Sequence, residues 1–143
     1  MSARLNPYLT FPGNAREAME FYRGVLGGTL TISTFEEGGM AQDPADADKV
    51  MHAQLETDSG FTLMGSDAPS TTPAGPMSGV QVSLSGDASA DAELSTYYDR
   101  LAQGGTVVEP LEQAPWGDKF GMVTDPYGVL WMVNIAGADS TPQ

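Results

Sequence analysis

The sequence predicts an α+β protein made of two βαβββ modules, and two internal repeats support this prediction. Residues 21–30 read FYRGVLGGTL and residues 97–107 read YYDRLAQGGTV, so similar residues lead into Gly-Gly-Thr twice. Residues 60–64, GFTLM, likewise match residues 128–132, GVLWM. Each half also shows the same order of expected elements: strand, helix and three strands. We therefore expect modules at residues 4–66 and 79–136, joined by a Pro-rich linker at 67–78, in a single domain of 143 residues.

The first half follows this order from its N-terminus. Residues 4–11 alternate and favour a strand. Asn14 stands three residues before Glu17, which predicts a capped helix start, and Gly27-Gly28 predicts the helix end. Further strands are expected at residues 29–35, 50–57 and 61–65. The acidic, turn-rich stretch 36–49 is expected to be a loop, either a solvated connection or a lid over a binding site.

The second half repeats the pattern. A strand is expected at residues 79–85, and Asp87 or Ser89 is expected to cap a helix that ends at Gly104-Gly105. Strands at 106–111, 119–124 and 129–135 complete the module. Strand periodicity predicts which side chains pack on the helices. These are Leu5, Leu9, Phe11, Val80, Val82, Leu84 and Trp131.

Charge and composition exclude several function classes. The chain has 19 acidic and 6 basic residues, for a net charge of −13, which opposes binding to nucleic-acid phosphates. Those acids serve solubility, and they also suit a cationic ligand. Without cysteine there is no disulfide, thiolate nucleophile or Cys-based zinc site. The N-terminal segment lacks a signal peptide's apolar run and no stretch is long enough to span a membrane, so we expect a cytoplasmic protein without membrane partners.

Several segments together resemble the vicinal oxygen chelate superfamily, which contains glyoxalases, bleomycin resistance proteins and dioxygenases, and most closely its PhnB-like branch. The segments are GNAREAMEFYRGVLGG, VMHAQL, LMGSDAP and WGDKFGMVTDPYGVLWMVN. The resemblance extends from about Leu5 to Asn134. It implies two curved mixed sheets around a cleft and, commonly, a homodimer. It also implies that enzymes of the superfamily hold a divalent metal with His, Gln or Glu from the first and last strands of each module.

The residues at the matching positions are unsuited to such a metal. The resemblance places the four metal positions at Asn6, Met64, Gln81 and Met132, and none of these is His, Asp or Glu. Thioethers are soft ligands, and a hard divalent ion needs anionic or imidazole ligands to offset its lost water. We therefore expect no metal and no cofactor. The methionines could form an adaptable apolar floor beside an amide pair, or could simply fill core space.

Other candidate residues each have a functional and a structural interpretation. His52 is the only histidine and could act as a general base, with Glu56 on the same strand face orienting it through a water. The alternative is a structural histidine that is hydrogen-bonded at the barrel wall. Tyr8 and Ser83 should face the cleft, where Tyr8 could stack on a ligand or only pack. Trp116 lies in an expected loop and fits either the cleft rim or a dimer contact.

These observations favour a metal-free protein that binds a small molecule rather than an enzyme. A cationic ligand such as a bleomycin-type drug is one specific form of this hypothesis. The ligand-binding candidates are Asn6, Tyr8, Met64, Gln81, Ser83, Trp116 and Met132. The alternative is a metal-dependent lyase, isomerase or dioxygenase with non-standard ligands such as His52 and Glu56. A third interpretation is an interaction module whose cleft is closed by its own side chains.

Overall fold

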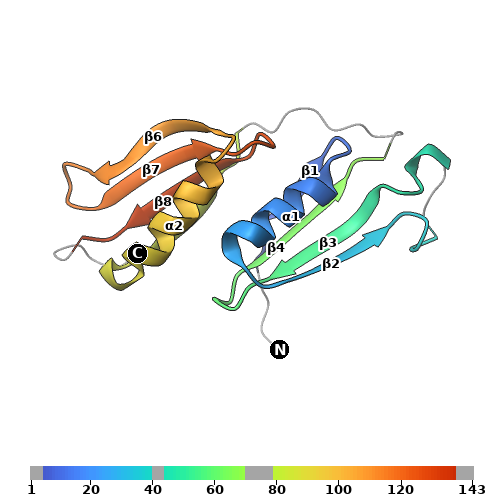
Figure 1. Cartoon of the computed structure of the whole chain (residues 1–143), viewed down its shortest axis with the longest axis horizontal. Helices are drawn as coiled ribbons and strands as arrows, with labels where there is room; N and C mark the ends of the chain where they lie inside the picture. The colour runs from blue at the N-terminus through green and yellow to red at the C-terminus, as the bar shows by residue number, and fades with distance from the viewer. Residues whose placement is uncertain (1–4, 40–43, 70–78, 138–143) are drawn as a thin grey trace. The chain divides into compact units, whose positions relative to one another are not determined.

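The structure is a computed structural model and describes residues 5–39, 44–69 and 79–137. The chain divides into two compact units, Met1–Gly75 and Pro76–Gln143. Each unit contains one four-stranded mixed sheet with a long helix across one face (Figure 1). The strand orders are β1-β4-β3-β2 and β5-β8-β7-β6, which are the same order in two copies. The predicted α+β fold of two βαβββ modules is therefore confirmed.

The first unit contains β1 (Tyr8–Phe11), α1 (Ala15–Leu26), β2 (Thr29–Thr34), β3 (Val50–Glu56) and β4 (Thr62–Asp67). A short 3-10 helix, η1 (Pro44–Asp46), lies between β2 and β3. β1 runs parallel to β4, and the other neighbouring strands are antiparallel. One face of the sheet packs on the apolar side of α1. The residues buried there include Leu9, Phe11, Ala18, Met19, Tyr22, Val25, Leu55 and Leu63.

The start of α1 is capped from another strand. Asn14 occupies the N-cap position, but its side chain makes no capping hydrogen bond, so the predicted Asn14–Glu17 capping box is wrong. Instead the buried carboxylate of Asp67, at the end of β4, accepts hydrogen bonds from the Ala15 N–H (2.8 Å) and the Val50 N–H (2.9 Å). An anion is favourable at a helix N-terminus, and charge-assisted bonds are stronger than the neutral bond that Asn14 could supply.

The second unit contains β5 (Val82–Gly86), α2 (Asp91–Ala102), β6 (Thr106–Gln113), β7 (Lys119–Thr124) and β8 (Leu130–Ile135). A 3-10 turn, η2 (Ala88–Ala90), leads into α2. The Asp87 carboxylate accepts the Ser89 N–H and so caps η2, whereas Ala90 holds the N-cap position of α2 and makes no side-chain capping hydrogen bond. The prediction that Asp87 or Ser89 caps α2 itself is therefore wrong. α2 buries Leu94, Tyr97, Tyr98 and Leu101 against the sheet. Trp131 is also buried, as predicted.

The repeated Gly-Gly-Thr has a steric cause. A Cβ at Gly28 would collide with the carbonyl oxygen of Glu56, and one at Gly105 would collide with that of Thr124. The threonines that follow, Thr29 and Thr106, pair with these same two residues in the sheets. Each module therefore needs glycine where the chain leaves its helix and passes close to the neighbouring strand.

The structure corrects some strand limits. Leu5 and Val80 were predicted to pack on the helices, but they are 99% and 74% exposed because the first strands begin only at Tyr8 and Val82. The predicted loop 36–49 contains η1, whose Asp46 is buried and forms an ion pair with Lys49 at 3.0 Å. Residues 40–43 of that loop and 70–78 of the linker lie outside the described residues. Among the helices of the described residues, none is long and apolar enough to cross a membrane.

Candidate functional site

Each sheet has a second face, directed away from its helix, and we call these the open faces. On the first sheet, Tyr8 pairs with Met64 across β1 and β4, and Met64 pairs with Gln54 across β4 and β3. These residues alternate with the buried side chains, so they share the open face. Met64 and Gln54 are half-buried, and Tyr8 is 49% exposed.

His52 joins two of these residues through hydrogen bonds. Its Nδ1 lies 3.2 Å from the Tyr8 hydroxyl, and its Nε2 lies 3.3 Å from Gln54 Oε1. The rings of Tyr8 and His52 are 5.7 Å apart between centroids and tilted by 36°. The imidazole is therefore held from both sides, by residues of β1 and β3.

The direct hydrogen bonds of His52 are with Tyr8 and Gln54 rather than with Glu56. Orientation of His52 by Glu56 through a water stays a prediction. Glu56 is exposed at the end of β3 and pairs with Thr62 of β4. Gln54 was noted only as a strand neighbour of His52, and the period-two spacing of VMHAQLE is the signal that places the two side chains on one face.

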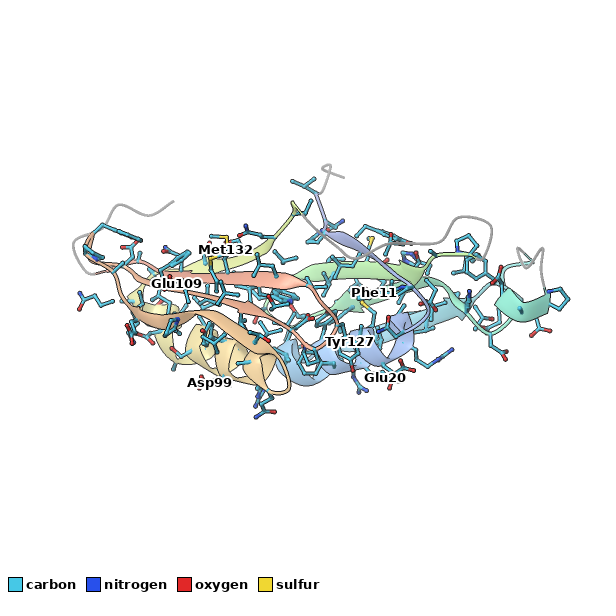
Figure 2. All side chains as sticks on the ribbon, turned by 90° about the horizontal axis from the view of Figure 1, so that it is seen from above. Phe11, Glu20, Asp99, Glu109, Tyr127 and Met132 are labelled. Atoms are coloured by element: carbon cyan, nitrogen blue, oxygen red, sulfur yellow. The ribbon has the colours of Figure 1, made fainter. Side chains whose placement is uncertain are left out.

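The open face of the second sheet is more apolar. Met132 of β8 pairs with Ser83 of β5 on one side and with Met122 of β7 on the other. Figure 2 shows Met132 on the side of the sheet away from α2. Phe120 pairs with Asn134 in the next row of this face. Sequence reasoning placed Ser83 and Met132 here but missed Met122, although the alternation of KFGMVT would have indicated it.

Asn6 and Gln81 lie just before β1 and β5 rather than within them. The strand partners of Met64 and Met132 are Tyr8 and Ser83, two residues further along in each module. Asn6 is partly exposed and Gln81 is exposed. The predicted amide pair therefore flanks the open faces, one amide in each unit, and the hydroxyl side chains of Tyr8 and Ser83 stand beside the thioethers.

Trp116 lies in the turn between β6 and β7 and is 64% exposed. Its ring contacts that of Phe120, with centroids 6.3 Å apart, so it stands at the end of the second open face. The turn is fixed by buried Asp118, which accepts hydrogen bonds from Asn134 Nδ2 (3.2 Å) and the Gly137 N–H (3.0 Å). Whether Trp116 contacts a ligand or another subunit stays a prediction.

Tyr98 of α2 positions the outer strands of the second sheet. Its ring occupies the space over Gly121, where a Cβ would collide, and its hydroxyl donates to the Glu109 carbonyl at 2.7 Å. Burial raises the pKa of this phenol above its ordinary value, with the nearby charges of Asp99 and Glu109 acting in the same direction. Tyr98 thus stays neutral and holds β6 against β7.

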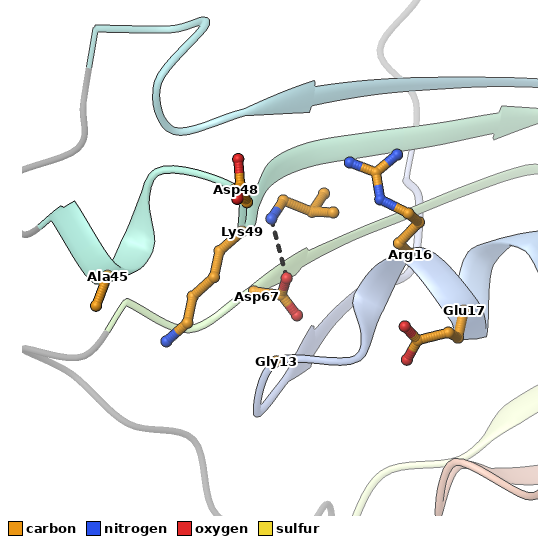
Figure 3. Close-up of a pocket in the computed structure, with 8 residues that line it drawn as sticks. Gly13, Arg16, Glu17, Ala45, Asp48, Lys49 and Asp67 are labelled. Carbon is orange, nitrogen blue, oxygen red and sulfur yellow. Dashed lines mark hydrogen bonds between the residues drawn. The ribbon is translucent and has the colours of Figure 1, made fainter.

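A cavity of about 220 Å³ lies on the helix side of the first unit and not on its open face (Figure 3). It adjoins the Asp67 carboxylate, whose oxygens are already used by Ala15 N–H and Val50 N–H. Lys49 at its wall is paired with Asp46. The lining carries both charge signs and contains none of the open-face residues: Gly13, Arg16, Glu17, Ala45, Asp48, Lys49, Val50 and Asp67.

The donor groups do not fit the divalent metal that the superfamily resemblance implies. The implied positions hold the amides of Asn6 and Gln81 and the thioethers of Met64 and Met132, none of them an anionic or imidazole ligand. Within the part of the chain that the structure describes, no three His, Cys, Asp or Glu side chains gather closely enough to bind a metal ion. No reaction step through a metal can be derived from these residues.

Comparison with known proteins agrees with the geometry. Protein YjdN from Escherichia coli is 32% identical over 148 residues, covering 96% of this chain and 98% of that protein. The crystal structure of PA1353 from Pseudomonas aeruginosa is 42% identical with a TM-score of 0.78, covering 95% of this chain and 99% of that one. The PhnB protein from Bacillus cereus is 27% identical with a TM-score of 0.69, covering 94% and 100%. A family model matches residues 4–133, and the chain therefore belongs to the Glyoxalase/Bleomycin resistance protein/Dioxygenase superfamily.

Proposed function

We propose that this protein binds a small organic molecule on its open sheet faces and does so without a metal. The observation that carries the proposal is the pairing of Met122 with Met132, next to Ser83, on the open face of the second sheet. Small-molecule sites combine an apolar lining with a few placed polar groups. Flexible, polarisable thioethers beside a hydroxyl meet that description.

The second open face offers mainly an apolar surface for van der Waals contact. Same-face residues that pair across antiparallel strands have Cβ atoms about 5 Å apart, so the side chains of Met122 and Met132 form one continuous surface. Both are half-buried, which leaves part of each thioether for a ligand. Phe120 and Trp116 extend this surface with aromatic rings. A flat or extended apolar group is the ligand part that this face would take.

The charge of the chain favours a neutral or cationic ligand. A net charge of −13 raises the local concentration of cations and repels anions. Sequestration of a bleomycin-type cationic drug is one specific form of the proposal. The superfamily's name includes bleomycin resistance proteins, and that likeness supports this form only as a family analogy.

Calorimetric titration with metal-free bleomycin, at low and at high salt, tests this form. We expect binding that weakens as salt rises. Met132→Ala should weaken it by roughly tenfold, because removing a covered thioether arm costs about 1–2 kcal/mol. Met132→Leu should restore most of the affinity, and Met51→Ala, whose side chain lies against Gly38 in the first unit, is the matched control. Absence of heat with bleomycin and with other organic cations would exclude the cationic form.

Metal analysis of protein purified without chelator separates binding from the alternative enzymatic function. The donor chemistry at Asn6, Met64, Gln81 and Met132 leads us to expect no stoichiometric nickel, zinc, manganese or iron. A metal present at one per chain, and lost in His52→Ala, would instead support a metal-dependent lyase, isomerase or dioxygenase.

Assembly and location follow only from the resemblance and from sequence. We propose a homodimer located in the cytoplasm, with the two modules acting as one domain. Sedimentation equilibrium tests the homodimer, and cell fractionation tests the location. Limited proteolysis within residues 70–78 tests whether the two modules act as one domain.

A further inference from the structure

We infer that Tyr8, His52 and Gln54 form a hydrogen-bond chain that presents the Tyr8 oxygen as an acceptor for a protonated amine of the ligand. The inference rests on the proposed function and specifies the chemistry of its first open face. All three residues belong to the first unit, and two hydrogen bonds join them, of 3.2 Å and 3.3 Å.

The direction of the hydrogen bonds follows from which atoms can donate and which can only accept. Gln54 Oε1 can only accept a hydrogen bond, so His52 Nε2 carries the proton. A neutral imidazole with its proton on Nε2 accepts at Nδ1, so the Tyr8 hydroxyl donates to it. The hydroxyl proton is thereby directed inward. The remaining lone pairs of the Tyr8 oxygen are then available to a donor outside, and the side chain is 49% exposed.

The surroundings favour a cationic donor. Within their bounds, β1, β2, β3 and β4 contain no lysine or arginine. The carboxylate of Glu56 lies on the same face as Gln54, two residues further along β3. Met64, which pairs with both Tyr8 and Gln54, supplies an apolar contact, and the Tyr8 ring adds an attractive face for a cation. An organic ammonium group that carries N–H bonds satisfies all three features.

Three probes that share a phenyl ring and differ in the charged group separate the possibilities: benzylammonium, benzyltrimethylammonium and benzoate. Their binding can be followed at pH 8 by the methyl NMR signals of the eight methionines, with Met64 assigned by Met64→Leu. We expect benzylammonium to shift the Met64 signal at the lowest concentration. Tyr8→Phe should weaken benzylammonium about fivefold, the loss of one hydrogen bond, and leave benzyltrimethylammonium unchanged.

Gln54→Leu tests the positioning role. It frees the imidazole tautomer, so we expect the preference for benzylammonium over benzoate to shrink while Met64 still responds to both. Tyr127→Phe, in the second unit, is the matched control and should change neither affinity. The hydrogen-bond chain is refuted if benzoate binds best, or if Tyr8→Phe weakens both cations equally; ligand binding by the protein then still stands. If no probe shifts the methyl signal of Met64, Met122 or Met132, both the hydrogen-bond chain and the proposed function are refuted.

Discussion

Replacing Asp125 by asparagine should destabilise the second unit strongly, although the two side chains have nearly the same shape. Asp125 is buried at the turn between β7 and β8. Its Oδ1 accepts hydrogen bonds from the N–H groups of Tyr127 (2.8 Å) and Val129 (3.0 Å), and its Oδ2 accepts from Trp131 Nε1 (2.8 Å). One carboxylate therefore holds both the turn and the largest core side chain.

The loss of stability follows because an asparagine would place two hydrogen-bond donors against each other. An asparagine can keep its oxygen on the two backbone N–H groups, but its amide nitrogen then faces the Trp131 N–H, donor against donor. A lost charge-assisted bond with a buried unsatisfied donor costs about 1.5–3 kcal/mol, and the two remaining bonds become weaker neutral ones. We expect a total of about 3 kcal/mol, which for a chain of this length lowers Tm by roughly 10 °C.

A double-mutant cycle identifies the cause. Trp131→Phe removes the opposing N–H, so Asp125→Asn should cost about 1–2 kcal/mol less in that background than in the wild type. Urea denaturation followed by circular dichroism measures all four proteins, because Trp131 fluorescence is lost in two of them. Asp99→Asn, on the outer side of α2 (Figure 2), is the exposed control and should change stability by less than about 0.5 kcal/mol. If the costs of Asp125→Asn and Trp131→Phe simply add, the reasoning is refuted.

Three further predictions concern glycine, tyrosine and methionine positions. Gly28→Ala and Gly105→Ala should each lower Tm clearly, because the new Cβ collides with a strand carbonyl. Gly24→Ala, in open space within α1, should instead raise stability by up to about 1 kcal/mol. Thermal melts that rank these three variants otherwise would contradict the steric account. Since burial raises the pKa of Tyr98, the unfolded state loses that proton first as pH rises, so stability should fall above about pH 10 in wild type but less in Tyr98→Phe. Met122→Gln should fold normally, since Gln54 occupies the corresponding place in the first sheet, yet should weaken organic-cation binding seen at the Met132 methyl signal; unchanged binding would remove Met122 from the proposed surface.

The fold could be predicted because its signals are local. Each copy of Gly-Gly-Thr, the helical stripe of α2 and the alternation in β3, β4, β7 and β8 can be recognised within about a dozen neighbouring residues. The strand starts could not be predicted in the same way. Alternation continues through Leu5 and Val80, but pairing with a neighbouring strand begins only at Tyr8 and Val82, and a single strand's sequence does not contain its partner's limits.

The candidate site was only partly predictable for the same reason. Period two places Tyr8, His52 and Met64 on one face, but the hydrogen bond between Tyr8 and His52 joins residues 44 apart and depends on β4 lying between their strands. The Asp67 cap of α1 joins residues 52 apart and replaced a local capping signal at Asn14. In both cases sheet register determines which side chains meet, and register is a property of the assembled unit.

Comparing the two modules position by position separates what the backbone requires from what the side chains specify. Tyr8 and Ser83 occupy the same place, since each pairs with the methionine of its closing strand, and Gln54 and Met122 are the corresponding partners on the other side. The registers match, so the backbone does not explain why one face ends in a hydrogen-bond chain and the other in a thioether pair. The methionine of the closing strand is kept in both rows, while its neighbours differ in chemistry. A surface that served packing alone would have no need for hydrogen-bonded polar side chains in one copy, so this difference adds to the proposal, carried by the Met122–Met132 pair, that the open faces bind a ligand.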